Sequence, residues 1–133
     1  MFLNQLNDDE KDMFISLSVH AAETNGDFAD EENRMIQEYC KEMGVVFFDS
    51  KNIKPMSEVT DYFNSVDISV KRIVYLELIG LLYADGDFDE LEQSFAKEFA
   101  EKIGLSQKEV DIQTNLLNKY LEITKEMFTA INL

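Results

Sequence analysis

The 133-residue sequence predicts an all-α fold of about six helices, and three observations support this prediction. Glycine and proline, which disfavour helix interiors, occur only five times and once. Apolar residues recur every three or four positions over several long stretches, as expected when one side of a helix is buried. An acidic motif also occurs twice at a fixed interval, which indicates that a helical unit has been duplicated.

The duplicated motif reads NGDFADEE at residues 25–32 and DGDFDELE at residues 85–92. Its glycines, Gly26 and Gly86, lie 60 positions apart, and the same offset aligns the flanking residues without a gap. We interpret each copy as a helix, an acidic turn and a second helix, with the two copies related by an approximate two-fold axis.

A chain of this length is expected to form one domain with its own core. The predicted parts are repeat one at about 8–44, the linker with a short helix at about 45–67, repeat two at about 68–104 and a C-terminal helix at about 106–131.

Repeat one begins with a helix predicted from Asn7 or Asp8 to about Thr24. Acidic residues crowd its first turn, where they interact favourably with the helix dipole. The second helix is expected over about 30–43. Gly44 follows at the position where a left-handed residue commonly ends a helix.

In the linker, Pro55 precedes a short helix predicted over about 56–65. Repeat two then opens with the most apolar helix of the chain, over about 69–84. This helix is hydrophobic almost all round, so we expect it at the centre of the fold. Asp89 is the predicted cap of the next helix, which ends near Ile103.

The C-terminal helix is predicted to begin at a capping box formed by Ser106 and Glu109. Its apolar stripe is expected to be buried, with the helix either lying across both repeats like a strap or breaking near Asn118. The stripe comprises Val110, Leu117, Tyr120, Leu121, Thr124, Met127, Phe128 and Ile131.

The net charge of −15 is the strongest global feature of the sequence. It predicts repulsion from nucleic acids and from anionic membranes, and it favours cations or a basic protein as partners. The longest apolar run, Ile73 to Ala84, contains Glu77 and is too short to span a bilayer, so direct membrane insertion is not expected.

Targeting and cysteine signals indicate a cytoplasmic protein. Residues 1–6 lack the basic region of a signal peptide, and the chain soon becomes acidic. The single cysteine, Cys40, excludes an internal disulfide and lies at the spacing of a small core residue.

The acidic motif has a structural interpretation that requires no ligand. Gly86 ends one helix, Asp89 caps the next, and Glu92 completes a capping box at its third position. Copy one follows the same plan, although Ala29 replaces the capping aspartate.

A functional interpretation starts from the acids that capping does not require, Asp27, Asp85 and Asp87. Clustered carboxylates repel one another unless they are solvated or a cation bridges them, and their oxygen atoms suit calcium first and magnesium second. The candidate metal ligands are Asn25, Asp27, Glu32, Asp85, Asp87, Asp89 and Glu92.

The sequence excludes an ordinary EF-hand as the form of this site. Both copies match the second half of the calcium loop, but two ligand positions of the first half are occupied by Leu81 in copy two and Ala21 in copy one. Because neither side chain can bind an ion, a cation would have to be held in another way, such as by carboxylates drawn from both turns.

Residues 84–92, ADGDFDELE, and the amphipathic helix that ends at 104–106 resemble the TerB-like (tellurite resistance protein B) domain family. Residues 22–44 resemble the same motif in its other half, and residues 1–4 resemble the opening of small stand-alone members. The resemblance implies an all-helical fold, an acidic metal-binding surface and a role in a stress-response assembly rather than in catalysis. Asn25 departs from the aspartate of the family pattern.

The preferred hypothesis is a non-catalytic, cytoplasmic TerB-like module whose acidic face binds a divalent cation and a protein partner, in stress response or tellurite resistance. The alternative is a purely structural acidic adaptor that binds a basic partner without metal. An enzyme is not expected, because the single histidine, His20, and Cys40 lie on separate predicted helices. A hydrolase that uses Asp27 and Asp87 is the remote alternative.

Overall fold

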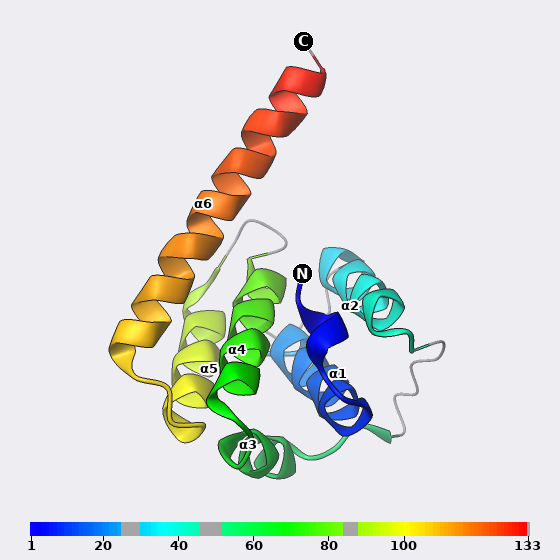
Figure 1. Ribbon diagram of the computed structural model, residues 1–133, viewed down its shortest axis with the longest axis vertical. Helices are drawn as coiled ribbons and strands as arrows, with labels where there is room; N and C mark the ends of the chain where they lie inside the picture. The colour runs from blue at the N-terminus through cyan, green and yellow to red at the C-terminus, as the bar shows by residue number, and fades with distance from the viewer. Residues whose placement is uncertain (25–29, 46–51, 84–87, 133) are drawn as a thin grey trace.

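The computed structural model describes residues 1–24, 30–45, 52–83 and 88–132, which form six α-helices, one short 3-10 helix and no strand (Figure 1). The all-α prediction is confirmed, and the helices begin and end close to their predicted bounds. The elements are η1 (Leu3–Gln5), α1 (Asp8–Ala22), α2 (Asp30–Met43), α3 (Met56–Asn64), α4 (Ile68–Leu82), α5 (Glu90–Lys102) and α6 (Gln107–Ile131).

The local backbone repeats at the 60-residue offset seen in the sequence. Helices α1 and α4 have equivalent bounds, and the glycines that follow α2 and α5 both have positive φ angles, 74° at Gly44 and 85° at Gly104. The amide of Gly44 donates to the carbonyl of Lys41, as that of Gly104 does to the carbonyl of Glu101. The two-fold relation of the hairpins in space stays a prediction.

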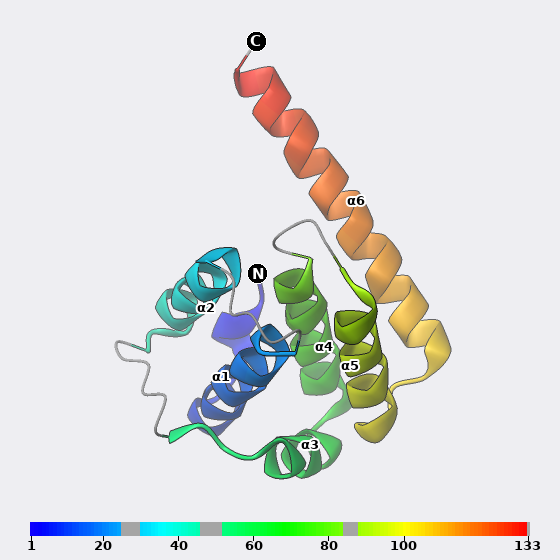
Figure 2. The same cartoon turned by 180° about the vertical axis from the view of Figure 1, so that it is seen from behind.

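Helix α4 lies at the centre of the fold, as its apolar sequence predicts. It contacts every other helix and also η1, and both ribbon views place it in the middle of the body (Figures 1 and 2). Its side chains Val74, Leu78, Leu81 and Leu82 are almost completely buried. The body of the protein therefore consists of η1 and α1–α5 arranged around one central helix.

The centre of α4 contains a buried carboxylate, that of Glu77, of which only 1% is exposed. Its Oε1 lies 2.8 Å from the N-terminal amine of Met1 and accepts a 2.7 Å hydrogen bond from the amide of Phe2. The hydroxyl of Tyr39 in α2 donates to the backbone carbonyl of Glu77 at 3.0 Å. This cluster joins the N-terminal segment, α2 and α4.

The charge of Glu77 changes the protonation of the N-terminal amine. Burial lowers the pKa of the amine, but the hydrogen bond and the negative charge of Glu77 raise it, and Glu42, whose Oε2 lies at 3.1 Å, adds to this effect. The pKa is therefore raised from its ordinary value of 8.0. The amine of Met1, a partly exposed residue, thus forms an ion pair with the buried carboxylate of Glu77.

The predicted burial of the C-terminal helix is wrong. Helix α6 is one continuous helix of 25 residues that does not break near Asn118 and does not cross both repeats. Its first half packs against α4, and its second half extends beyond the body (Figures 1 and 2). At 1.5 Å per residue the helix is about 37 Å long, so it is longer than the 13- to 15-residue helices α4 and α5 beside it.

Only Leu117 of the predicted stripe is fully buried. Tyr120, Met127, Phe128 and Ile131 are between 50% and 77% exposed, because the body ends before it can cover them. No helix in the described part of the chain is long and apolar enough to cross a membrane, α6 included.

Replacing Glu77 by glutamine should lower the free energy of unfolding by about 2 kcal/mol, because the amine of Met1 loses its charged acceptor. The amide oxygen of the new side chain can still accept from Phe2, so folding is retained. Urea denaturation measures the change. The control is Glu98→Gln, which removes an exposed pair with Lys102 and should cost less than about 0.5 kcal/mol. Equal effects of the two substitutions would contradict this account of Glu77.

The raised pKa of the Met1 amine predicts that the protein loses stability as the pH rises above 8. Above pH 8 the unfolded chain releases the amine proton while the folded chain retains it, so the unfolded state becomes favoured as pH rises. Above pH 9 the buried thiol of Cys40, whose pKa burial raises from 9.0, adds to the same trend. The urea midpoint should fall as the pH rises above 8 in the wild type and stay flatter in Glu77→Gln.

Candidate functional site

Most of the predicted metal ligands lie outside the described residues. This applies to Asn25, Asp27, Asp85 and Asp87, and to the side chain of Glu32, whose backbone begins α2. Among the described residues, no group of three or more aspartate, glutamate, histidine or cysteine side chains is arranged to hold a metal ion. The cation site therefore stays a prediction.

The two described members of the predicted ligand set belong to the start of α5. Asp89 is the N-cap and its Oδ1 accepts a 2.8 Å hydrogen bond from the amide of Glu92, while the side chain of Glu92 is buried. Phe88 packs its ring 4.4 Å from that of Tyr83 at the end of α4. The capping role predicted for Asp89 is confirmed.

The helices that precede the two acidic turns end in the same local conformation. The residues that end α1 and α4, Glu23 and Tyr83, have the same backbone angles, φ −88° and ψ 0°. Helices α1 and α4 pack against each other, and in both ribbon views they end on the same side of the body (Figures 1 and 2).

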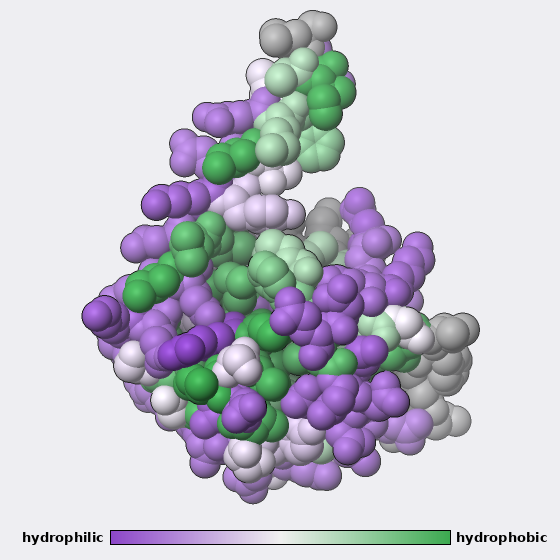
Figure 3. Space-filling view, viewed as in Figure 1, coloured by the Kyte–Doolittle hydropathy of each residue, from purple (hydrophilic) through white to green (hydrophobic). Residues whose placement is uncertain are grey.

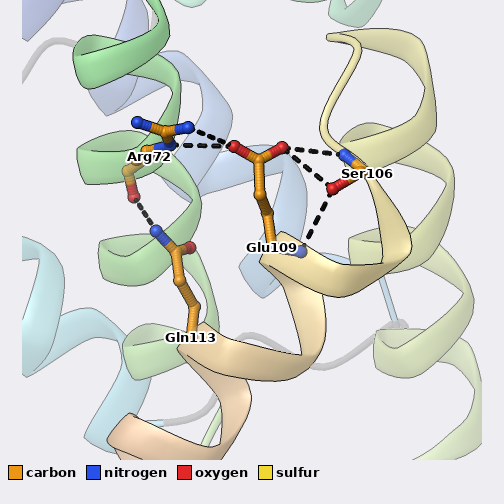
Figure 4. Close-up of polar contacts among 4 residues, drawn as sticks. All are labelled: Arg72, Ser106, Glu109 and Gln113. Carbon is orange, nitrogen blue, oxygen red and sulfur yellow. Dashed lines mark hydrogen bonds and ion pairs between the residues drawn. The ribbon is translucent and has the colours of Figure 1, made fainter.

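A network of polar contacts holds the first turns of α6 against α4 (Figure 4). Ser106 and Glu109 form the predicted capping box, and Glu109 Oε1 accepts hydrogen bonds from Arg72 at 2.6 and 2.9 Å. The amide of Ser106 and the guanidinium of Arg72 hold the pKa of Glu109 below its ordinary value. The Gln113 side chain donates to the Arg72 carbonyl at 3.0 Å. The start of α6 is thereby fixed in direction.

A continuous row of exposed apolar residues runs along α6. We call it the α6 seam, and its members are between 48% and 77% exposed. Phe128, which is 62% exposed, lies next to it. The seam comprises Ile112, Leu116, Tyr120, Ile123, Met127 and Ile131.

A shallow apolar groove of about 360 Å³ lies beside the start of the seam. Its floor includes Phe2, Ile73 and Leu76, and Gln113 of α6 forms one wall. Figure 3 shows hydrophobic residues gathered along α6 and continuing onto the adjoining surface of the body. The seam and the groove together form one extended apolar surface.

A second groove, of about 620 Å³, lies between α4, α5 and the start of α6 and has a mixed polar lining. Burial raises the pKa of Tyr75 in this groove to about 12, although a hydrogen bond with Thr114 opposes the shift. The phenol therefore remains protonated at neutral pH. It can donate a hydrogen bond but cannot serve as a general base.

The charge of the chain is unevenly distributed along the sequence. Residues 119–133 contain two lysines and two glutamates and are neutral, so residues 1–118 carry the entire net charge of −15. The outer half of α6 is thus an amphipathic helix with no net charge, attached to a strongly acidic body.

Comparisons with family models, with curated proteins and with solved structures found no match to this chain. The assignment to the TerB-like family accordingly stays a prediction.

The predicted stripe of α6 shares only Tyr120, Met127 and Ile131 with the seam. The prediction missed Ile112, Leu116 and Ile123, and it did not anticipate the exposure of the helix. The predicted helix is longer than every other predicted helix, and this length was the signal that part of it would extend beyond the body. Glu77 was also noted only as an interruption of an apolar run. A charged residue in a helix that is otherwise hydrophobic all round requires a partner, and that requirement was the signal for its ion pair.

Proposed function

We propose that this chain is a non-catalytic protein-interaction module in which the body presents α6 as a docking helix. The observation that carries the proposal is the α6 seam, a row of large apolar residues on a helix whose start is fixed by Arg72 and Glu109. Exposed apolar surface of this extent is unfavourable in water and is typical of a surface that another protein covers. An amphipathic helix that binds through one face is a common form of such recognition.

The acidic turns support a second proposal, a response to divalent cations in the manner that the TerB-like resemblance implies. The helices that precede the two turns, α1 and α4, pack against each other and end in the same local conformation, which favours carboxylates from the two turns acting on one ion. Binding would reduce the charge of the body and change the protein partner that it accepts. We also propose a cytoplasmic role in stress response. The alternative to cation binding is an acidic face that binds a basic partner without metal.

Replacing Met127 and Phe128 together by glutamate should abolish association through α6, because two charges would have to be buried in the interface. The measurement is hydrogen exchange of α6 at high chain concentration and in cell extract, compared with the dilute chain. Protection of residues 112–131 is expected in the wild type and not in the variant.

The matched control for this variant is Leu91→Glu, since Leu91 on α5 is exposed to a similar degree, 56%. It should leave the protection of α6 unchanged. An outer half of α6 that exchanges equally fast in all conditions would show that the seam is not a docking surface.

Calcium should bind saturably and raise the melting temperature in the wild type but not in a variant that combines Asp85→Asn with Asp87→Asn. Isothermal calorimetry at near-physiological salt measures the binding, with magnesium and zinc as comparators. Loss of two carboxylates removes the charge that attracts the ion, while a matched rise in monovalent salt should not reproduce the stabilisation. Identical calcium responses in the two proteins would rule out the turns as the site.

A further inference from the structure

We propose that the occupant of the α6 seam is the α6 of a second copy of this chain, packed antiparallel to the first. This inference rests on the proposed function and names its partner. Five features support it: the exposed area, the spacing of the seam, the charges beside it, the adjacent groove and the distribution of net charge along the chain.

The area of the seam suits a dimer. The six seam residues and Phe128 together expose on the order of 800 Å², which is similar to what each partner contributes to a standard interface. A second α6, with the same length and the same seam, supplies a matching area of the same chemistry. The interface would be isologous, as two-fold symmetric dimers are.

The intervals between successive seam residues are the same whether they are counted from the N-terminal or the C-terminal end of the seam. Successive members from 112 to 131 are separated by four, four, three, four and four residues. An antiparallel partner therefore meets every layer with an apolar residue. Ile112 faces Ile131 of the second copy, Leu116 faces Met127, and Tyr120 faces Ile123, in the three- and four-residue spacing of a coiled-coil seam.

The charges beside the seam favour the antiparallel direction. Lys119 and Glu126 lie on the same flank of the seam, seven residues apart. In the antiparallel arrangement Lys119 of each chain comes opposite Glu126 of the other, which gives two symmetric ion pairs. In a parallel pair in register, the partner residue that flanks the seam opposite Lys119 is Thr124. No ion pair can therefore form there.

The groove on the body provides a further contact for the second copy. The tip of α6 carries Phe128 and Ile131, which the body of its own chain does not cover. Antiparallel pairing brings this tip to the start of the other α6, where the apolar groove of Phe2, Ile73 and Leu76 lies. The exposed tip of each chain thus covers the exposed groove of the other.

The distribution of charge also requires the two bodies to lie apart. Each body carries the full charge of −15, and a parallel pair would place both bodies at the same end. Antiparallel pairing places the two bodies beside opposite halves of the paired helices, so they are displaced from each other along the helix axis and do not lie side by side. The neutral outer half of α6 meets no such repulsion.

The first test is the mass of the full chain in solution, measured by sedimentation velocity over a wide concentration range. We expect twice the 15.4 kDa chain mass, and Met127→Glu should raise the dissociation constant by about tenfold or more. Leu91→Glu is the matched control and should not change it. Helical circular dichroism confirms that each variant is folded.

Charge reversal at Lys119 and Glu126 tests the proposed ion pairs, because a purely hydrophobic contact would not respond to it in this way. Lys119→Glu alone and Glu126→Lys alone should each weaken the dimer by about threefold, because like charges then face each other. The two substitutions combined in one chain restore the opposite charges and should recover most of the affinity.

The orientation is tested by cysteine cross-linking in a Cys40→Ala background. When Leu116→Cys and Met127→Cys chains are mixed, the mixed disulfide between the two positions should form in preference to either symmetric disulfide. Symmetric 116–116 and 127–127 products would overturn the antiparallel arrangement.

A chain that stays monomeric at all concentrations would overturn the dimer. The proposed function would then survive only if proteins from extract still protect the α6 seam from hydrogen exchange. A monomer with no protection in extract would overturn both. The two failures are therefore distinguished by experiments on the same variants.

Discussion

A buried carboxylate in the middle of the central helix is the constraint on which the body depends. Helix α4 contacts every other element, and Glu77 lies among its buried positions. A carboxylate in such a place is strongly unfavourable without a charged partner. The amine of Met1 and the amide of Phe2 supply that partner, so the chain end is held against α4 and Leu3 is buried beside it. The packing of the core is thereby coupled to one ion pair.

The position of the N-terminal segment also determines the surface next to α6. Phe2, held by its amide to Glu77, forms part of the apolar groove with Ile73 and Leu76. The start of α6 is held at the edge of the same groove, because Glu109 and Gln113 both bind Arg72. Two residues of α4 therefore fix this surface: Glu77 holds the N-terminal side of the groove, and Arg72 sets the direction in which the outer half of α6 leaves the body.

The parts of this architecture that could be predicted from the sequence are those with local causes. Asn7 and Ser106 cap the helices that their sequences indicate, and Gly44 ends α2 with a positive φ angle, because capping depends on residues a few positions away. The ion pair of Glu77 joins groups 75 or more residues apart, and no local pattern specifies it. Residues 25–29 and 84–87 of the acidic turns lie outside the described residues, so most of the predicted ligand set rests on the sequence alone.

The error over α6 has a physical reason that bears on its function. An apolar stripe has the same periodicity whether its partner is the body of the chain or another molecule, so periodicity predicts a buried face but does not identify what buries it. The net charge of the helix distinguishes burial by its own body from burial by another molecule. A helix that completes the body could share its acidity, whereas residues 119–133 are neutral and carry Lys119 and Glu126 on one flank. The absence of net charge removes the repulsion that a second acidic copy would otherwise meet at this helix. The sequence of α6 thus has both an apolar seam and no net charge in its outer half. A helix that only packed on its own body would require the apolar residues but not the local neutrality.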